Sequence, residues 1–512
     1  MATLLFLGAS VSQLPAIKHA REQGHRVVAV DGDPNAVAFP FADVIVEVDF
    51  SDVEQVTAAG REHKVDGVLA ISSDRAVLPA ATVAEALGLP GIGAGVARAM
   101  TDKWTMRARL ARAGIPQPKH VLVTAGSNLR ARLERVPTPA VLKPADSGGQ
   151  RGLFMIESAA DAEAHLDEVL AFSRSGHAML EEYVEGTELN GIIVVRDGEP
   201  TLITLSDRLR PRGLGFGVGW IHSYPSSVSP QGLGRAREVA FDAVRALGLR
   251  DGIAFPQLIV KDDEPWLIEI AARIGAGQMA DLVRYATGVE LFDVAILQAL
   301  GRPVPDELIS TASTRPIAIR FLTAEPGVLP VGEVISIEGL DRVRESRGVL
   351  AADLYFGVGA TIGPLRVDAD RRGYVIATAD SASAALELAD AAARKLKVGT
   401  RSGSRQRFRP RVLVPATAVL AVAAAVLAVL VFRHATQPKL VADSFSDNNG
   451  VLLVHYRFDE PVRVVLLVDG KPAEETRMQS SGELVWHDRK GRHHLAIEGI
   501  DRAGHRSAVT SV

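Results

Sequence analysis

The chain has 512 residues, of which 57 are basic and 61 are acidic, and its formal net charge is −4 at pH 7. A single hydrophobic core stops growing well below this length, so several domains are expected. The near balance of charge excludes the general nucleic-acid footprint of a basic protein. The absence of cysteine excludes disulfides, thiolate zinc sites and a cysteine nucleophile.

The first 100 residues alternate short apolar runs with helical patterns, starting with a strand at Thr3–Leu7. This alternation predicts an α/β domain in which helices cover both faces of a parallel sheet. A Gly-Ala-Ser turn follows the first strand and Asp31 ends the second, as in nucleotide-binding crossovers. The G-x-G-x-x-G spacing is absent, so a dinucleotide site is not expected. We expect this layer to contribute a loop or two to a substrate site.

Two lysines lie where the local pattern changes. Lys103 follows Asp102 at the start of an amphipathic helix that ends at Gly114, before two prolines. Lys143 lies on a predicted strand, Pro139–Ala145, which the loop DSGGQRG follows. Glycines in such a loop allow backbone N–H groups to fold over an anion, although they also suit a flexible hairpin turn. The loop glycines are Gly148, Gly149 and Gly152.

Acidic residues gather at the end of the next predicted strand. Met179–Val184 has the sequence MLEEYV and is followed by EGTE, which places Glu188 seven residues after Glu181.

A later segment, Ser206–Tyr224, combines arginines with glycines, aromatic residues and His222. Arginine side chains suit carboxylates or phosphates, and a glycine-rich loop can close over them. For any single arginine, a solvated position on an exposed loop is an equally good interpretation. We assign no role to His222, which has no evident partner in the sequence. The arginines are Arg208, Arg210 and Arg212.

The most informative segment is Gly252–Gly277, in which two apolar strands flank a turn of acidic residues and proline. If Lys261 lies opposite Pro265 across this turn, then Gln257 lies opposite Glu269. Opposed residues on one face of a hairpin have Cβ atoms roughly 4.5–5.5 Å apart. An amide oxygen and a carboxylate at that separation can share a magnesium ion, which prefers oxygen ligands.

Strand alternation places Ala271 and Arg273 on the same face as Glu269. The hairpin therefore presents an amide, a carboxylate and a guanidinium on one wall, an arrangement suited to a metal-bound polyphosphate. An ordinary surface hairpin remains the alternative when this segment is taken alone.

Taken in order, these motifs resemble those of the ATP-grasp ligases over about Met1–Val398. The shared features are the DK helix with its GIP ending, the strand lysine before a glycine-rich loop, the E-E-Y-V-x-G-x-E hinge and the E-x-x-x-R hairpin. The pair Gln257 and Glu269 is most similar to the synthetase domains of carbamoyl-phosphate synthase, and Arg315–Val398 is similar to the closing subdomain of amino-acid ligases. The resemblance implies a pre-ATP-grasp α/β domain (1–100), an α+β ATP-grasp domain (101–310) and a C-terminal subdomain (311–398).

The resemblance also implies the cofactors ATP and Mg²⁺ (or Mn²⁺) and a role for each motif residue. Lys143 and Arg273 are the implied catalytic residues: Lys143, with Lys103, contacts ATP phosphates, and Arg273 steadies the phosphoryl group or acyl phosphate. Gln257 and Glu269 are the implied metal ligands. Glu181 is implied to accept the adenine amino group, the Val184 backbone to form a hinge contact and Glu188 to hold the ribose. The remaining implied nucleotide contacts are Glu182 and the loop glycines Gly148, Gly149 and Gly152, and the three arginines of the 206–224 segment are candidate substrate ligands.

One position departs from the family pattern. Asparagine usually lies two residues after the metal glutamate, whereas this chain has Ala271, which offers no oxygen to a second magnesium ion. Water or ATP oxygens can replace the ligand, because magnesium commonly retains waters. The alternative is a protein with feeble or lost catalysis.

The function that follows is an ATP-dependent carboxylate–amine ligase, in which ATP phosphorylates a carboxylate and an amine then displaces phosphate. One alternative is an ATP-binding transmembrane sensor or pseudo-ligase with little turnover. A second is a biotin-carboxylase-like enzyme that activates bicarbonate.

Residues 412–432 contain no charged residue, and 21 such residues suffice to cross a bilayer core of about 30 Å. Basic residues are concentrated before this segment, in a predicted linker at 399–411 that could rest on anionic headgroups. The positive-inside rule predicts a single-pass protein of the cell membrane, with the N-terminal region cytoplasmic and the C-terminus extracytoplasmic. A buried helix of a globular core is the competing interpretation.

The tail, 439–512, changes to short β-rich runs separated by turns. Val451–Phe458 and Val462–Val468 are predicted as two separate strands. The spacing suggests a small all-β sandwich, and the ending IEGIDRAGHRSAV resembles bacterial immunoglobulin-like modules. The resemblance implies a spacer role or binding of an unknown extracytoplasmic partner.

Overall fold

The computed structural model describes residues 1–210, 218–311 and 314–401, and within the C-terminal part 440–447, 451–468, 471–475, 479–487, 495–500 and 510–511. The chain divides into two compact units, Met1–Arg405 and Gln406–Val512.

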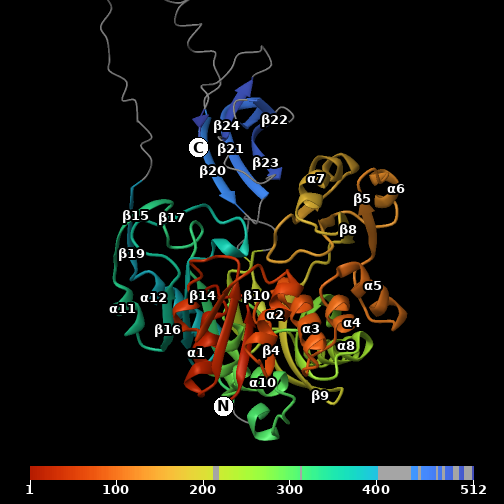
Figure 1. Cartoon of the computed structure of the whole chain (residues 1–512), viewed down its shortest axis with the longest axis vertical. Coiled ribbons are helices and arrows are strands. Elements are labelled where there is room, and N and C mark those ends of the chain that lie inside the picture. Colours follow the sequence, from red (N-terminus) through yellow and green to blue (C-terminus); the bar gives the residue numbers. More distant parts are fainter. Residues whose placement is uncertain are drawn as a thin grey trace, which may run out of the picture. The chain divides into compact units, whose positions relative to one another are not determined.

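The N-terminal layer is the predicted parallel sheet, with strand order β3-β2-β1-β4. It is the red part of the ribbon in Figure 1. Successive residues of β1 enter different cores: Leu4 packs in the cluster that contains Ile17 of α1, and Leu5 packs in the cluster that contains Val56 of α2. Helices therefore cover both faces, as predicted. The elements are β1 Thr3–Leu7, α1 Leu14–Glu22, β2 Arg26–Asp31, β3 Val44–Glu47, α2 Val53–Glu62, β4 Gly67–Leu69 and α3 Asp74–Leu87.

Two helices, α4 (Ala94–Ala99) and α5 (Lys103–Arg112), lead to a small lobe. The lobe is an antiparallel sheet of order β5-β8-β6-β7 with two helices, and it lies apart from the larger sheet in Figure 1. Its elements are β5 His120–Thr124, α6 Leu129–Leu133, β6 Ala140–Pro144, β7 Phe154–Ile156, α7 Ala159–Ala171 and β8 His177–Glu182.

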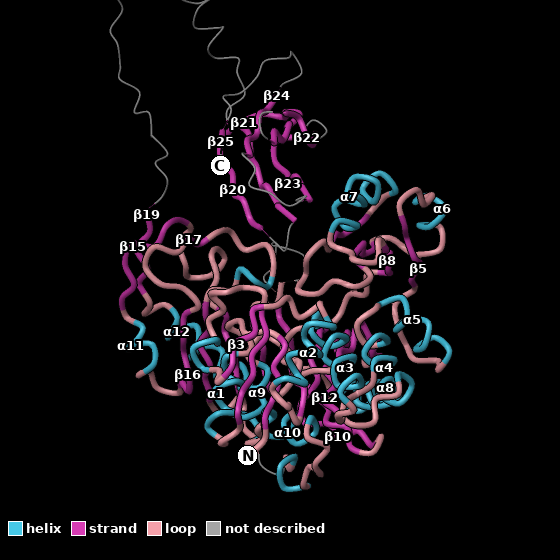
Figure 2. Tube along the Cα trace, in the orientation of Figure 1, coloured by secondary structure: helices cyan, strands magenta, loops and turns pink. Residues whose placement is uncertain are grey.

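An eight-stranded sheet has the order β13-β12-β9-β10-β11-β14-β18-β16. Three of its strands, β10, β12 and β16, are labelled in Figure 2. Strands from the C-terminal third extend this sheet, because β14 pairs with β11. The strands are β9 Thr187–Arg196, β10 Glu199–Leu209, β11 Ile221–Tyr224, β12 Gly252–Lys261, β13 Glu264–Ala271, β14 Ile317–Phe321, β16 Val349–Leu354 and β18 Gly373–Thr378. The associated helices are α8 Pro230–Leu247, α9 Met279–Thr287, α10 Leu291–Ala299, α11 Leu340–Arg344 and α12 Ala382–Ala393.

A separate three-stranded sheet, β17-β15-β19, completes this unit. Its strands are β15 Gly332–Glu338, β17 Thr361–Ile362 and β19 Lys397–Arg401.

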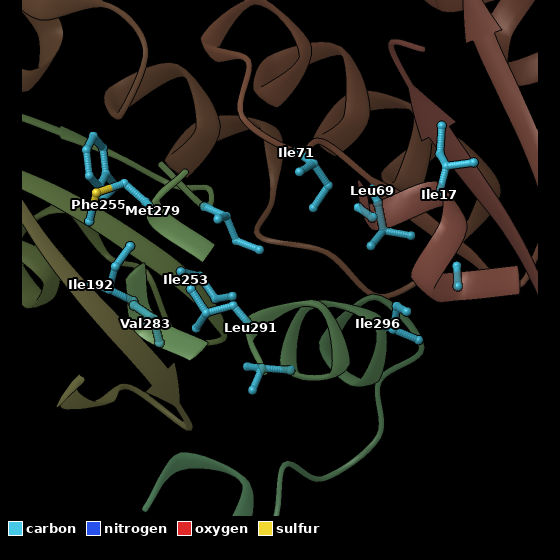
Figure 3. Packing of buried hydrophobic residues seen from close by; sticks show 14 of the residues in the cluster. Ile17, Leu69, Ile71, Ile192, Ile253, Phe255, Met279, Val283, Leu291 and Ile296 are labelled. Atoms are coloured by element: carbon cyan, nitrogen blue, oxygen red, sulfur yellow. The ribbon is translucent and has the colours of Figure 1, made fainter. Parts of the chain in front are cut away.

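One core cluster joins the N-terminal layer to the large sheet (Figure 3). Ile17 and Leu69 come from the first layer, Ile192 and Ile253 from the large sheet, and Ile296 from α10. Burial of such side chains contributes roughly 1.5–3 kcal/mol each. The two layers are therefore parts of one packed body.

The β12–β13 hairpin confirms the predicted pairing of Gln257 with Glu269, although the predicted register at the turn is wrong. The turn contains only Asp262 and Asp263, both with positive φ (+52° and +63°), so Lys261 pairs with Glu264 rather than with Pro265. Two residues with positive φ are typical of the tight hairpin turn that suits strand twist. A bulge opposite Leu258, in which Ile268 is the extra residue, restores the pair.

The described residues of the second unit are all β-structure, as predicted. The predicted break between 458 and 462 is wrong, because β21 (Val451–Val468) is one strand. Its first part pairs with β20 and β23, and its second part pairs with β22 and β24. The sandwich and the immunoglobulin-like character stay predictions. The other strands are β20 Leu440–Asp447, β22 Lys471–Glu475, β23 Gln479–His487, β24 Leu495–Ile500 and β25 Thr510–Ser511.

Within the described ranges, no helix has the length and apolar character needed to cross a bilayer. The predicted start of the linker at 399 is wrong, because residues 399–401 belong to β19. The predicted span at 412–432 and the rest of the predicted linker, 402–411, lie outside the described residues. Both therefore stay predictions.

Gly186 lies where the chain passes from the small lobe to β9, and a Cβ there would be 2.5 Å from the carbonyl oxygen of Val260. We expect Gly186→Ala to destabilise the first unit by about 1–3 kcal/mol, the usual cost of overpacking. Gly234→Ala in α8 is the matched control, since a Cβ there meets no atom within 4 Å. Gly234→Ala should stabilise the first unit by about 0.5–1 kcal/mol, because alanine favours the helical conformation more than glycine does. Scanning calorimetry measures both, and equal midpoints would contradict the contact.

Candidate functional site

A cavity of about 260 Å³ lies between the small lobe and the β9–β13 side of the large sheet. Predicted site residues from segments far apart in the sequence line this cavity. Gly152 is not in its lining, and Arg212 lies outside the described residues. The predicted residues that line it are Lys103, Lys143, Gly148, Gly149, Glu181, Glu182, Val184, Glu188, Arg208, Arg210, Gln257, Glu269 and Arg273.

A buried ion cluster holds Lys143 on β6. Its Nζ lies 2.7 Å from a carboxylate oxygen of Glu181, which also accepts two hydrogen bonds of 2.9 Å from Arg107 of α5. Burial favours a neutral Glu181, but the two cations outweigh it and hold the pKa of this carboxyl well below its usual range. Burial, with Arg107 and Lys103 nearby, lowers the pKa of Lys143 against the attraction of Glu181.

These contacts change the interpretation of Glu181. Both carboxylate oxygens of Glu181 accept hydrogen bonds from Arg107 or Lys143. The Glu181 side chain therefore positions Lys143. Arg107 was not predicted, although it lies four residues after Lys103 and therefore on the same face of α5. Its guanidinium also donates to the carbonyls of Leu267 and Ile268, which ties α5 to the hairpin.

Lys103, the first residue of α5, lies near this cluster. Its Nζ donates to the carbonyl of Ser147 at 2.7 Å and lies 3.0 Å from Glu269 Oε1. Burial favours the neutral amine, but Glu269 outweighs burial and raises the pKa of Lys103. The side chain of Asp102 caps the helix by accepting from the Thr105 N–H. One lysine thus contacts both the glycine-rich loop and the predicted metal glutamate.

The glycine-rich loop needs its glycines for conformation and space. Gly149 and Gly152 have φ of +73° and +65°, which side chains rarely adopt. At Gly148, a Cβ would lie 2.7 Å from a carboxylate oxygen of Asp74. The loop therefore packs directly against the N-terminal layer.

Asp74 also holds Arg273. The guanidinium donates two hydrogen bonds to this carboxylate, of 2.7 and 2.8 Å. Burial lowers the pKa of Arg273, but Asp74 outweighs burial and raises it. Asp74 was not predicted as a site residue. It opens α3 beyond the carboxyl end of β4, the edge at which parallel sheets bind ligands, and that position is the signal in the sequence.

The predicted metal pair lies on adjacent strands. Gln257 is opposite Glu269 on one side and opposite Asn190 of β9 on the other, and its Nε2 donates to Asn190 Oδ1 at 3.2 Å. Within the described ranges, no three acidic, histidine or cysteine residues gather as a metal site. One carboxylate and one amide oxygen fit a magnesium ion that takes its other ligands from phosphate and water.

Three further acidic residues of the cavity lining contact basic side chains or the backbone. Glu188 accepts from Arg208 at 2.6 Å and from Arg210 at 2.7 Å. Glu182 accepts from the Lys119 N–H at 3.2 Å. Asp368, which was not predicted, lies 3.5 Å from Arg208 and 3.6 Å from Arg371. The predicted ribose and substrate roles of Glu188 and the arginines stay predictions.

The arrangement is that of an enzyme class in which two sheets enclose a nucleotide between cationic side chains and a metal pair. Residues 100–277 match the ATP-grasp domain, residues 17–91 the ATP-grasp N-terminal domain, and residues 320–401 the L-amino acid ligase C-terminal domain 2. This part of the chain belongs to the ATP-grasp superfamily.

Relatives with assigned activities include carbon–nitrogen ligases. The carbamoyl phosphate synthase large chain of Vibrio parahaemolyticus is 26% identical over 349 residues, covering 67% of this chain and 31% of that protein. Alanine–anticapsin ligase of Bacillus subtilis is 27% identical over 262 residues, covering 47% of this chain and 55% of that protein. This chain spans 31–60% of the length of the curated relatives it matches.

Solved structures share the fold. The L-amino acid ligase of Bacillus licheniformis has a TM-score of 0.68 at 21% identity, covering 78% of this chain and 99% of that one. The biotin carboxylase domain of the Hydrogenobacter thermophilus 2-oxoglutarate carboxylase, solved with MgADP and bicarbonate, has a TM-score of 0.64 at 17% identity over 78% and 90%. Membership of the superfamily agrees with the predicted class, an ADP-forming ligase, and with the predicted cofactors ATP and Mg²⁺.

Arg107 provides a test of the buried cluster. We expect Arg107→Leu to destabilise the first unit by about 3 kcal/mol or more, because it strips partners from a buried carboxylate and two carbonyls. Arg235→Leu is the control, since Arg235 pairs with Glu264 on the surface and such pairs contribute under about 1 kcal/mol. Chemical denaturation compares the two variants, and similar losses would contradict the cluster's role.

Proposed function

We propose that this chain is an ATP-dependent carboxylate–amine ligase that acts through an acyl phosphate. The observation that carries the proposal is the contact of Lys103 with Glu269, opposite Gln257 and beside Lys143. Two phosphate-binding cations thus border the residues that would hold Mg²⁺.

Phosphoryl transfer requires positioning of the phosphates and neutralisation of their charge, and different residues of the site would provide each. Lys103 and Lys143 hold the phosphates, with the loop glycines Gly148, Gly149 and Gly152 closing over the β- and γ-phosphates. Gln257 and Glu269 would hold Mg²⁺, which would supply neutralisation of phosphoryl charge when bound. Nucleoside contacts come from the Val184 backbone, Glu182 and Glu188, with Glu181 positioning Lys143.

Arg273 stabilises the acyl phosphate. A carboxylate oxygen of the substrate attacks the γ-phosphorus and ADP leaves with its bridging oxygen. The amine nitrogen then attacks the carbonyl carbon, phosphate departs, and the nitrogen loses a proton to give an amide. Arg208, Arg210 and Arg212 lie on the segment proposed to contact the substrates.

The relatives support an amino acid as one substrate, since one of them is by name an alanine–anticapsin ligase and another a carnosine synthase. Ala271 supports the second candidate, an ATP-binding pseudo-ligase or sensor. Ala271 is buried, with 3% of its surface exposed, and it lines the cavity. Its side chain has no oxygen to offer a metal ion. A bicarbonate-activating enzyme has only the shared fold in its favour.

We expect ADP formation from MgATP to require a carboxylate–amine pair from a panel of amino acids with bicarbonate included. Lys143→Ala and Glu269→Ala should each lower that turnover by about 100-fold or more, as loss of a preorganised charge does. Lys261→Ala, on the exposed end of β12, is the matched control and should leave turnover unchanged. MgATP binding without turnover on any member of the panel would contradict the ligase and favour the pseudo-ligase.

We also propose that the chain is a single-pass protein of the cell membrane, with the ligase in the cytoplasm and the all-β part outside. The uncharged stretch 412–432 and the basic residues before it support this orientation. Alkaline phosphatase fused after Val512 should be active only if that end is outside. Fusion of the same enzyme after Arg401 is the control and should be inactive. The reverse pattern would overturn the topology.

A further inference from the structure

A chain of hydrogen bonds leads from the metal pair into the large sheet. Gln257 Nε2 donates to Asn190 Oδ1 at 3.2 Å, and Asn190 Nδ2 lies 3.3 Å from His222 Nδ1 on β11. Asn190 and His222 are almost fully buried, at 1% and 2% exposure. None of these contacts was evident in the sequence, because the three residues come from three different strands.

The chemistry of the amides fixes the direction of this chain. Gln257 can offer its oxygen to a cation only if its NH₂ group points away, towards Asn190. Asn190 then accepts with its oxygen and must donate with its nitrogen. His222 Nδ1 is therefore an acceptor, and a neutral ring carries its proton on Nε2. Burial, with Arg371 and Arg208 nearby, lowers the pKa of His222 to about 3, so the ring is neutral at physiological pH.

His222 lines the cavity, and its buried Nε2 has no hydrogen-bond partner among the described residues. Phe321 supports the ring edge-on, with centroids 5.3 Å apart. Gly277 has no side chain to fill the point beside it: a Cβ there would be crowded, at 3.2 Å from His222 Nε2 and 3.2 Å from Arg371 Nη1, so the two nitrogens lie close to the same point. Two donors thus converge on one small space.

The charge around this space favours an anion. Asp368 accepts from Arg208 and from the Gly219 N–H, and Arg371 donates to the Gly219 carbonyl at 3.4 Å. Arg208 also pairs with Glu188, as does Arg210. Arg208, Arg210 and Arg371 thus bring three guanidinium groups to the same part of the cavity lining.

We propose that Asn190 is a positioning residue that turns the Gln257 oxygen towards the metal and the His222 Nε2–H towards the substrate, and that His222 and Arg371 together receive an oxygen of the carboxylate substrate. The second part rests on the proposed ligase function. The first part concerns the protein itself and is open to tests that need no turnover.

The tautomer of His222 directly tests the hydrogen-bonded series from Gln257 through Asn190 to His222, which we call the relay. In ¹⁵N-labelled protein, His222, assigned with His222→Gln, should show a protonated Nε2 and an unprotonated Nδ1. Asn190→Asp keeps the acceptor for Gln257 but cannot donate, so the proton should move to Nδ1. Ser206→Ala is the matched control, because Ser206 donates only to the Asn190 carbonyl, and should leave the tautomer unchanged. An Nδ1–H tautomer in the unaltered protein, or no change in Asn190→Asp, would overturn the relay.

The affinity for ADP in the presence of Mg²⁺ tests the Gln257 end of the relay. Asn190→Leu should weaken calorimetric binding of ADP in the presence of Mg²⁺ by about 5–10-fold, the effect of one lost hydrogen bond. Binding of ADP without Mg²⁺ should stay within about 2-fold. Equal losses with and without the metal would show a merely structural role.

Acetate is the probe for the carboxylate. In the MgADP-bound protein, saturating acetate should shift the His222 Nε2 signal, and Arg371→Ala should abolish the shift. An unmoved signal would overturn the assignment of the space to a carboxylate. If the tautomer and acetate results hold while no panel substrate yields ADP, the relay stands and the ligase proposal fails.

Discussion

The requirement that each buried cation have a carboxylate partner organises the site. Lys103 lies against Glu269, Lys143 against Glu181, and Arg273 against Asp74. An unpaired buried charge costs several kcal/mol, so these acids hold the cations at positions where a polyphosphate can later take their place. Glu269 is the exception among the acids, because the same carboxylate is also the proposed metal ligand. Binding of MgATP would then exchange partners within a fixed set of charges rather than create new ones.

Three regions of sequence have to meet for this set to exist, and the core explains why they do. The N-terminal layer supplies Asp74, the small lobe supplies Lys143 and Glu181, and the large sheet supplies Glu269. The cluster shown in Figure 3 fixes the first layer against the large sheet. The C-terminal strands then bring Asp368 and Arg371 to the same cavity through the pairing of β14 with β11. The site is therefore a property of the assembled unit and not of the ATP-grasp segment alone.

Local patterns in the sequence predicted the parallel layer, the two lysines, the glycine-rich loop and the metal hairpin. The hairpin pair was correct although the turn register was not, because the bulge at Ile268 compensated for a turn shorter than expected. Partners of the predicted residues were missed where they are distant: Arg107 is 74 residues from Glu181, and Asp74 is 199 residues from Arg273. No local periodicity encodes such pairs. Asn190 and Arg371 were missed for the same reason, since only the tertiary fold brings them to the cavity.

Ala271 changes less than its place in the family pattern suggests. An asparagine at this position would add an oxygen but no charge, so the alanine leaves the electrostatic balance of the site intact. Lys103, Lys143 and Arg273 keep their carboxylate partners Glu269, Glu181 and Asp74 whichever residue stands at 271. The alanine lacks only the side-chain oxygen that would help to fix the position of a second metal ion. Because phosphoryl transfer depends mainly on charge neutralisation and alignment, a site with one well-held metal and two fixed lysines retains the larger part of what the chemistry requires.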